Sequence, residues 1–323
     1  MSDHTRCHRL EGLEPDNLLA FIALLGLLRA LDTARPSWRA RTAWDLDQPP
    51  LRPVLHLAEP QSRDVISRAA AEGISRLAEC YVFPAAPGGN ERQLDLNYST
   101  VRARELLIEA ASNEERERAD VLAALMCDAA GRDGRIEATP FCLLFGQGHQ
   151  HFLERLSQIP RLEAPPRRGR GKAAIELTPP ETIAEALFQP WERRDPTPAF
   201  RWDPAEDVRY ALRADDPSGD KATTQHGANR LAAIGLSVLT VAPAQRFDRV
   251  RLQVIGGSTG REFAFCWPIW REPASLAAIR ALLSHPDLDK GQEALAHFGV
   301  VQVRCARRIS VGKFMNFTRA ETI

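Results

Sequence analysis

An uninterrupted apolar run from Leu18 to Leu28 constrains this chain more than any other feature, since none of its side chains is charged or polar. A helix that is apolar on every face must be buried on every face. Asp16 or Asn17 can accept the free N–H groups of the first turn, and Pro36 prevents a long continuation. Crossing a bilayer takes roughly 20 apolar residues, more than this run provides. The run therefore predicts a buried core helix over residues 17–31 and no membrane partner.

Gly26 lies inside this helix, where glycine costs about 1 kcal/mol relative to alanine. We expect another element to approach the helix closely at that point. A second apolar segment, Thr223–Leu239, begins with a polar cluster and continues as a predicted helix over residues 229–239. Each of the two helices is expected to organise one part of the chain.

The chain of 323 residues is longer than a typical single core, which predicts two lobes. The predicted parts are an N-terminal lobe over 1–160, a basic linker or loop rich in proline and glycine over 161–180, and a C-terminal lobe over 181–323. Alternating apolar residues predict strands, including a β-hairpin over 250–270 with a glycine-rich turn. The expected class is α+β, with mixed but mostly antiparallel sheets and packed helices.

The balance of charges argues against a protein that attracts nucleic acid over its whole surface, because 42 basic residues face 42 acidic ones. Local patches are compatible with this balance. Only four of the basic residues are lysines, and arginine is the better ligand for phosphates and base edges, although a GC-rich genome produces the same bias. The six cysteines form no CxxC pair, and the polar first residues lack the pattern of a secretory signal. We expect free thiols and a cytoplasmic location.

Two basic segments supply the candidate contacts to a phosphate backbone. Between residues 161 and 172 five basic residues accompany one acid, a local charge of +4, so the segment is either a solvated linker or an arm that contacts nucleic acid. The segment from Gln302 to the end mixes cations with Phe314 and Phe317, which suits stacking on bases and equally a terminal strand. The predicted backbone contacts are Arg167, Arg168, Arg170, Lys172, Arg307, Arg308 and Lys313.

Polar residues at predicted helix starts are weaker candidates, for reading base edges in a groove. Amide and guanidinium groups can make bidentate contacts with bases. These candidates are Gln147, His149, Gln225, Asn229 and Arg230. By contrast, the segment 195–220 carries seven acids and three arginines, and we expect it to face solvent or a basic partner.

Catalytic signatures are missing from the sequence. It contains no HExxH zinc motif, no GxSxG nucleophile elbow and no phosphate-binding P-loop. We therefore expect a protein without catalytic activity, cofactor or bound metal. A hydrolase that uses His149, His151 or His226 is the less favoured alternative.

Three segments together resemble a known family: residues 12–31 (GLEPDNLLAFIALLGLLRAL), 200–220 (FRWDPAEDVRYALRADDPSGD) and 226–236 (HGANRLAAIGL). The set is similar to CRISPR-associated proteins of type I-G (formerly I-U) systems, as a small counterpart of the large subunit of the Cascade effector complex. The resemblance rests on helix cores and loops, without a catalytic motif.

The resemblance implies a binding role in antiviral defence. Such a subunit would help to recognise the short motif that flanks target DNA, hold the duplex during strand opening, and recruit the helicase-nuclease. Its partners would be other Cascade subunits, the guide RNA, target double-stranded DNA and the helicase-nuclease. The alternative is a scaffold or adaptor of the same complex that contacts only protein. None of the candidate residues above is taken from the family; all follow from their chemistry.

Overall fold

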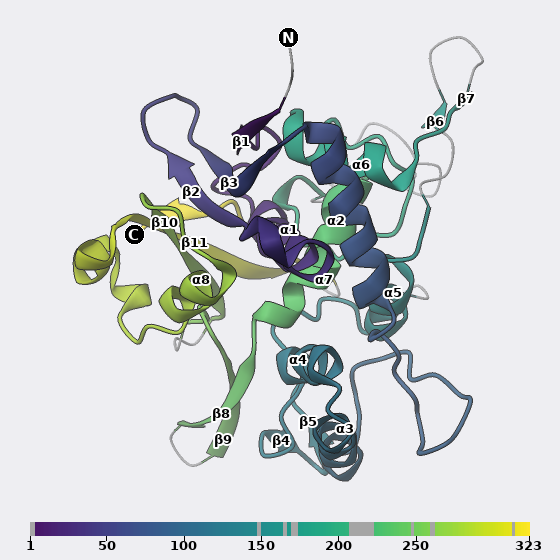
Figure 1. The fold of residues 1–323 in the computed structure, drawn as a ribbon. Helices are drawn as coiled ribbons and strands as arrows, with labels where there is room; N and C mark the ends of the chain where they lie inside the picture. Colours follow the sequence, from purple (N-terminus) through teal and green to yellow (C-terminus); the bar gives the residue numbers. More distant parts are fainter. Residues whose placement is uncertain are drawn as a thin grey trace.

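Helices and antiparallel strands make up the fold, which confirms the predicted α+β class (Figure 1). The computed structural model describes residues 4–146, 150–163, 167–168, 174–206, 223–246, 249–258, 262–311 and 314–323. Within these ranges every ladder between two strands is antiparallel. In the same part of the chain, the helices fall short of the length and apolar character needed to cross a membrane.

The predicted core helix is α1 (Leu18–Ala34), and its apolar run is buried throughout. Asn17 caps it, since the side chain of Asn17 accepts a hydrogen bond from the backbone N–H of Ala20 at 3.4 Å. The helix packs most extensively on α7 (His226–Gly235). The two buried helices therefore belong to one packed unit.

A pair of glycines allows α1 and α7 to approach each other. A Cβ atom added at Gly26 would lie 1.9 Å from the carbonyl oxygen of Leu231, and one added at Gly235 would lie 2.0 Å from that of Ile22. Such distances are possible only when both positions lack a side chain. This contact confirms the close approach predicted at Gly26.

Further helices surround this pair. The helix α2 (Arg63–Ala78) contacts α1, and α6 (Pro179–Phe188) contacts both α2 and α7. Ser62 caps α2 by accepting a hydrogen bond from the N–H of Val65 at 3.3 Å, as its place before the apolar pattern predicts. The remaining helices are α3 (Thr100–Ser112), α4 (Arg116–Leu125), α5 (Phe152–Gln158) and α8 (Leu276–Leu283), with 3-10 turns at Pro36–Trp38, Pro204–Glu206, Leu236–Val238, Leu288–Lys290 and Gln292–Phe298.

A three-stranded sheet lies near the N-terminus in the order β1 (Thr5–Arg9), β3 (Arg52–Gln61), β2 (Arg41–Asp45) (Figure 1). Alternate residues of β3 point to opposite faces, so that Leu55 and Leu57 are buried while His56 is half-buried on the outer face. This alternation gives the sheet one face on the core and one that can meet a ligand.

A second sheet has the order β10 (Ala264–Trp270), β11 (Val300–Val311), β12 (Phe314–Phe317), with β13 (Glu321–Thr322) also paired to β11. It meets α1 through the ring of Trp267, which stacks on Phe21 at 5.2 Å between centroids. Aromatic burial of this kind stabilises the contact between sheet and helix. The short ladders β4 (Gly131–Arg132) with β5 (Arg135–Ile136), and β6 (Arg167–Arg168) with β7 (Ala174–Ile175), complete the described strands, together with β8 (Val241–Arg246) and β9 (Arg249–Val254).

The hairpin predicted over 250–270 was wrong in its pairing. Strands form at both ends of that range, but β9 pairs with β8 and β10 pairs with β11. In the part of this range that the structure describes, the two predicted partners meet at the bridge between Gly257 and Phe265. Two residues separate β8 from β9 in the chain, which favours a tight hairpin between those strands. The period-two pattern predicts that a strand forms, but it does not determine which other strand pairs with it.

Residues of both predicted lobes contribute to one hydrophobic cluster, which extends from Leu10 to Ala320. The main contact within it joins α1 of the first predicted lobe to α7 of the second. The division at 161–180 stays a prediction about the chain's organisation, and the interior is shared across it.

Candidate nucleic-acid interface

The first turn of α7 is buried, together with all of its polar side chains. The exposed fraction is 4 % for Gln225, 1 % for Asn229 and 3 % for Arg230. A side chain must reach solvent to contact a base edge in a groove. These three groove-reading candidates are therefore buried in this structure. Their burial disagrees with the prediction that they contact DNA.

Arg230 and His226 instead hold the start of the basic segment. Arg230 donates from Nε and Nη2 to the carbonyl oxygen of Pro160, at 3.2 and 3.0 Å. A ring nitrogen of His226 lies 2.8 Å from the carbonyl oxygen of Leu162. Burial lowers the pKa of Arg230 to about 10, so the guanidinium still carries its charge at neutral pH. Two side chains of α7 thus fix the backbone at residues 160–162.

The basic segment is followed by α6, which packs on α7. Thr178 and Glu181 form a capping box, with a carboxylate oxygen of Glu181 accepting from the N–H of Thr178 at 2.7 Å. Hydrogen bonds from Thr178 lower the pKa of Glu181. A Cβ atom at Gly227 would lie 2.0 Å from the carbonyl oxygen of Thr182, which shows how closely α6 and α7 approach. The start of the basic segment is therefore bonded to α7, and the helix that follows the segment packs on α7.

Between these ends the chain forms the ladder of β6 and β7, in which Arg167 pairs with Ile175 and Arg168 with Ala174. Figure 1 shows this ladder standing away from the body at the upper right. Arg170 and Lys172 lie outside the described residues. We use the name basic ribbon for residues 161–175.

The two candidate arginines of the C-terminal basic segment differ in their accessibility. Arg307 is exposed on β11. Arg308 is half-buried, donates to the carbonyl oxygen of Pro140 at 3.3 Å, and lies over the ring of Phe263 at 5.6 Å. Burial lowers the pKa of Arg308. The strand alternative for this segment is confirmed by β11 and β12, and Lys313 lies outside the described residues.

Two acids of the segment 195–220 are buried rather than exposed to solvent or a partner. Asp195 accepts a hydrogen bond from the N–H of His226 at 3.0 Å, and so holds the start of α7. Asp203 accepts from Asn17 at 3.0 Å and from Nε of Arg193 at 2.7 Å, next to the start of α1. Part of the predicted acidic surface thus has a structural role. Residues 207–222 lie outside the described part of the chain.

The histidines proposed for a hydrolase have separate surroundings. His151 is within hydrogen-bond distance of Asp95, with Nδ1 3.0 Å from Oδ1, at the start of α5. His226 is buried against the backbone of Leu162, while His149, like Gln147, lies outside the described residues. Among the residues that the structure describes, no three of the types His, Cys, Asp or Glu gather closely enough to hold a metal ion.

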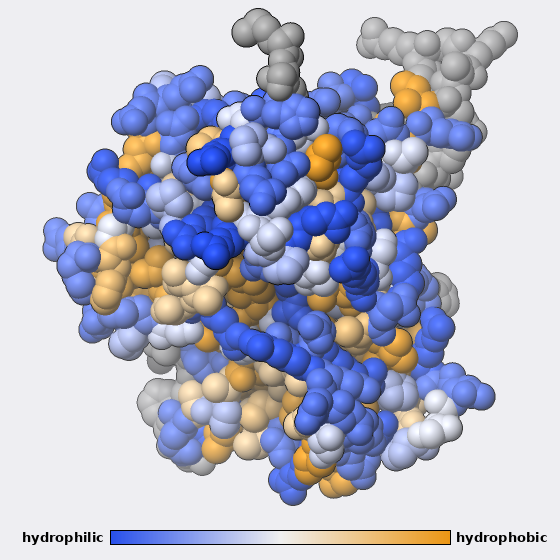
Figure 2. Space-filling model, viewed as in Figure 1, coloured by the Kyte–Doolittle hydropathy of each residue, from blue (hydrophilic) through white to orange (hydrophobic). Residues whose placement is uncertain are grey.

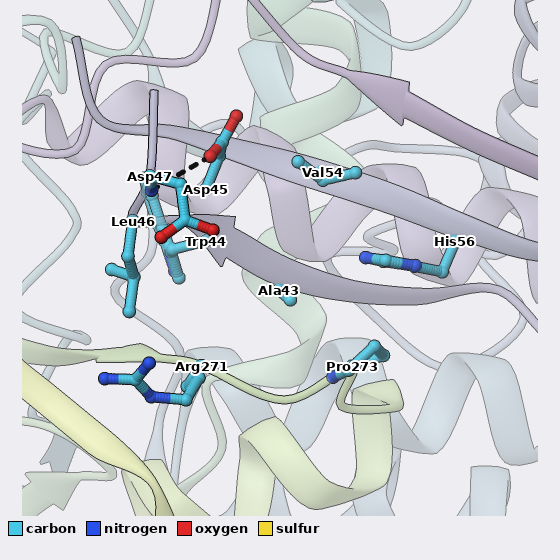
Figure 3. Close-up of a pocket in the computed structure, with 9 residues that line it drawn as sticks. All are labelled: Ala43, Trp44, Asp45, Leu46, Asp47, Val54, His56, Arg271 and Pro273. Carbon is cyan, nitrogen blue, oxygen red and sulfur yellow. Dashed lines mark hydrogen bonds between the residues drawn. The ribbon is translucent and has the colours of Figure 1, made fainter. Parts of the chain in front are cut away.

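A pocket of about 230 Å³ opens on the outer face of the N-terminal sheet (Figure 3). We call it the sheet-face pocket. Figure 3 shows the β2 and β3 residues on one side and Arg271 and Pro273, from the segment after β10, on the other. It is lined by Ala43, Trp44, Asp45, Leu46, Asp47, Val54, His56, Arg271 and Pro273.

His56, which lines the sheet-face pocket, belongs to a thiol–imidazole pair that sequence reasoning missed. Cys7 of β1 and His56 of β3 are partners in the ladder, with Sγ 3.4 Å from Nδ1. Burial lowers the pKa of His56. The alternation of His56 with buried leucines could have placed it on the outer face, but the pairing with Cys7 depends on a long-range register. Because Asp45 and Asp47 outnumber Arg271, the pocket does not suit a polyanion.

A third surface feature is an apolar groove of about 440 Å³ between α8 and the segment after β10. Figure 2 shows apolar side chains emerging on this side of the molecule, at the left, among otherwise mostly hydrophilic residues. Phe298 contributes an exposed ring, with 52 % of its surface accessible. We call this feature the α8 groove, lined by Trp270, Glu272, Pro273, Ala274, Ala278, Ala281, Leu282, His285 and Phe298.

Three surfaces are thus available: the basic ribbon, the sheet-face pocket and the α8 groove. Comparison with protein families, curated proteins and solved structures found no match. The resemblance to type I-G proteins accordingly rests on the three segments quoted above. Of the three surfaces, only the basic ribbon combines a net positive charge with a fixed attachment to the body.

Proposed function

We propose that this protein is a non-catalytic subunit of a CRISPR type I-G effector complex, where it contributes to recognition of target DNA and recruits the helicase-nuclease. The observation that carries the proposal is the attachment of the start of the basic ribbon to α7, where His226 lies 2.8 Å from the carbonyl oxygen of Leu162 and Arg230 donates to the carbonyl oxygen of Pro160 just before it. These contacts hold the described start of the ribbon, residues 161–163, close to the body of the protein. A segment tethered at its start loses less conformational freedom on binding than a free tail would.

The charge of the basic ribbon suits a phosphate backbone. Each cation that neutralises a phosphate releases counterions, so affinity for duplex DNA falls steeply with salt. In RNA-guided complexes, base pairing with the guide reads most of the target, while protein reads only the short flanking motif. The proposed partners are the guide RNA, target double-stranded DNA, other Cascade subunits and the helicase-nuclease. Arg307 on β11 is a further candidate for binding the DNA backbone.

The test is charge reversal of Arg167, Arg168 and Arg170 to glutamate. Binding of a fluorescent DNA duplex is measured by anisotropy over a range of salt concentrations, for the protein alone and for the complex with its operon partners. We expect affinity to fall about tenfold or more, and the salt slope to decrease by about 0.9 for each phosphate that the variant no longer neutralises. Unchanged affinity and slope would remove the ribbon from the proposed interface.

A matched control carries the same change of charge elsewhere. Arg104, Arg116 and Arg132 are exposed, and they lie on α3, α4 and β4 at the end of the molecule away from the ribbon (Figure 1). Their reversal to glutamate should leave DNA affinity within about threefold, because these positions are remote from the ribbon and partly screened by salt. An equal decrease in both variants would indicate a general effect of net charge instead of a defined interface.

The second candidate function is an adaptor that contacts only protein, and the α8 groove favours it. Exposed apolar surfaces of this kind often mark protein contacts. Replacing the exposed Phe298 with Asp should then prevent co-purification with the other subunits and leave DNA binding unchanged. The reverse pattern, in which only reversal of the ribbon charges has an effect, supports the first candidate.

A further inference from the structure

Two neighbouring strands of the C-terminal sheet bring two thiols together. Cys266 of β10 and Cys305 of β11 are direct partners in the antiparallel ladder, and their sulfur atoms are 2.8 Å apart. The N–H of Cys266 donates to the carbonyl of Gly256 instead of to β11. The pair therefore occupies a position without hydrogen bonds between the two strands, where Cα atoms approach to about 4.5 Å.

We propose that Cys266 and Cys305 are an oxidation site, at which a small-molecule disulfide converts the two thiols into a cross-strand disulfide. A disulfide needs Cα atoms roughly 4.4–6.8 Å apart and sulfur atoms that can meet. Direct opposition in the ladder and the 2.8 Å between the two sulfur atoms suit this geometry. The structure holds all six cysteines as free thiols. Elsewhere, Cys7 faces His56 and Cys142 donates to the carbonyl of Leu144, so neither has a second thiol as its partner.

The surroundings of the pair distinguish the two sulfurs. Cys266 is buried, whereas Cys305 is half-buried and thus the more accessible of the two. The thiol of Cys266 donates its hydrogen toward the sulfur of Cys305, and this hydrogen bond lowers the pKa of Cys305. The same contact, with burial, raises the pKa of Cys266. Arg307 further favours the thiolate of Cys305, while Asp289 and Glu321 oppose it. Cys305 is therefore the first nucleophile.

The reaction proceeds by two exchanges in which every atom is accounted for. The thiolate of Cys305 attacks one sulfur of the oxidant, its S–S bond breaks, and one thiolate leaves while a mixed disulfide forms on Cys305. Cys266 then loses its proton and attacks the sulfur of Cys305, and the second thiolate leaves. The two cysteines are oxidised by two electrons, the small disulfide is reduced to two thiols, and the two cysteine protons end on those thiols.

The test uses the full chain in a Cys7→Ser background, so that the exposed Cys7 does not exchange. The protein is incubated with oxidised glutathione, quenched in acid, alkylated with N-ethylmaleimide under denaturing conditions, and digested for mass spectrometry. We expect the peptides that contain Cys266 and Cys305 to be joined, with a loss of two hydrogen atoms, and Cys80 and Cys127 to be alkylated. The thermal midpoint of the oxidised protein should rise, because the link restricts the unfolded chain.

Two further variants separate this reaction from general oxidation. Cys305→Ser should abolish both the joined peptides and the rise in thermal midpoint, whereas Cys127→Ser should retain both. Alkylation of Cys266 and Cys305 after oxidation, or glutathione found on Cys305 without the joined peptides, would overturn the proposal. Because the joined peptides are sought in the chain with both thiols present, the result does not depend on whether Cys305→Ser folds.

Discussion

Substitution of Gly26 by alanine tests the contact on which the core depends. The added methyl group would lie 1.9 Å from the carbonyl oxygen of Leu231 and 3.0 Å from the backbone nitrogen of Gly235. Ordinary contact begins at 3.4 Å, so α1 and α7 would have to separate by about 1.5 Å at this point. The atoms in the way belong to the backbone of a buried helix, which cannot turn aside as a side chain would.

The expected decrease in stability can be worked out from this geometry. Overpacking of a core typically costs about 1–3 kcal/mol, and a clash between two rigid backbones belongs above that range, at about 4 kcal/mol. Alanine recovers about 1 kcal/mol of helix propensity. The net decrease in the free energy of unfolding is therefore about 3 kcal/mol. For a chain of 323 residues this lowers the thermal midpoint by about 4–5 °C.

Urea unfolding followed by circular dichroism measures this change, provided that the slope with denaturant stays constant. Gly89→Ala adds the same atom in a loop, where the nearest contact would be 3.5 Å, and should change stability by less than about 0.5 kcal/mol. The double variant with Gly235→Ala should cost less than the sum of the single changes, because one separation of the helices relieves both clashes. A Gly26→Ala protein as stable as the parent would refute the close contact of α1 with α7.

Three other changes probe the interior and the sheet-face pocket. Asn17→Ala removes the cap of α1 and a donor to buried Asp203, and should lower the free energy of unfolding by about 2–3 kcal/mol in urea titrations. Tyr81→Phe removes a hydrogen bond of 2.9 Å to the carbonyl of Ala233 and should lower the free energy of unfolding by about 1–2 kcal/mol. Burial raises the pKa of Tyr81 to about 12, so in the parent protein this phenol should ionise only at high pH in an ultraviolet titration. The lowered pKa of His56 means that the folded protein takes up this proton less readily than the unfolded chain, so stability should fall as pH drops below about 6.5. His56→Gln should reduce that acid dependence in thermal melts across pH, and an unchanged dependence would exclude His56 as its source.

The elements that sequence reasoning located well are those whose signal is local. The run from Leu18 to Leu28 is apolar in every direction, and a cap precedes it, so both its burial and its start follow from the chain itself. Gly26 is informative for a similar reason, since its cost within a helix requires a compensating contact. Ser62 before α2 is another local signal that the structure confirms.

The candidate interface was harder to predict because its partners are distant in the chain. A polar residue at a helix start has the same sequence signature whether it faces a ligand or a buried carbonyl group. Arg230 and Asn229 proved to be of the second kind, since Arg230 bonds to Pro160 and Asn229 to the carbonyl of Gln225. The partner of β10 depended likewise on long-range register, which alternation alone does not specify. The acids Asp195 and Asp203 look solvent-exposed by composition and are held inside by specific donors.

The contact of α1 with α7 also bears on how the protein is made. The first helix leaves the ribosome long before the second is synthesised, with roughly 200 residues between the two glycines that meet. At about 5–20 residues per second, α1 waits about 10–40 s for the surface that covers it. During that interval, a chaperone or transient partners must cover this helix, because it is apolar on all sides. Nascent chains that stop before α7 would keep this helix uncovered, which makes the late segment a checkpoint for successful biosynthesis.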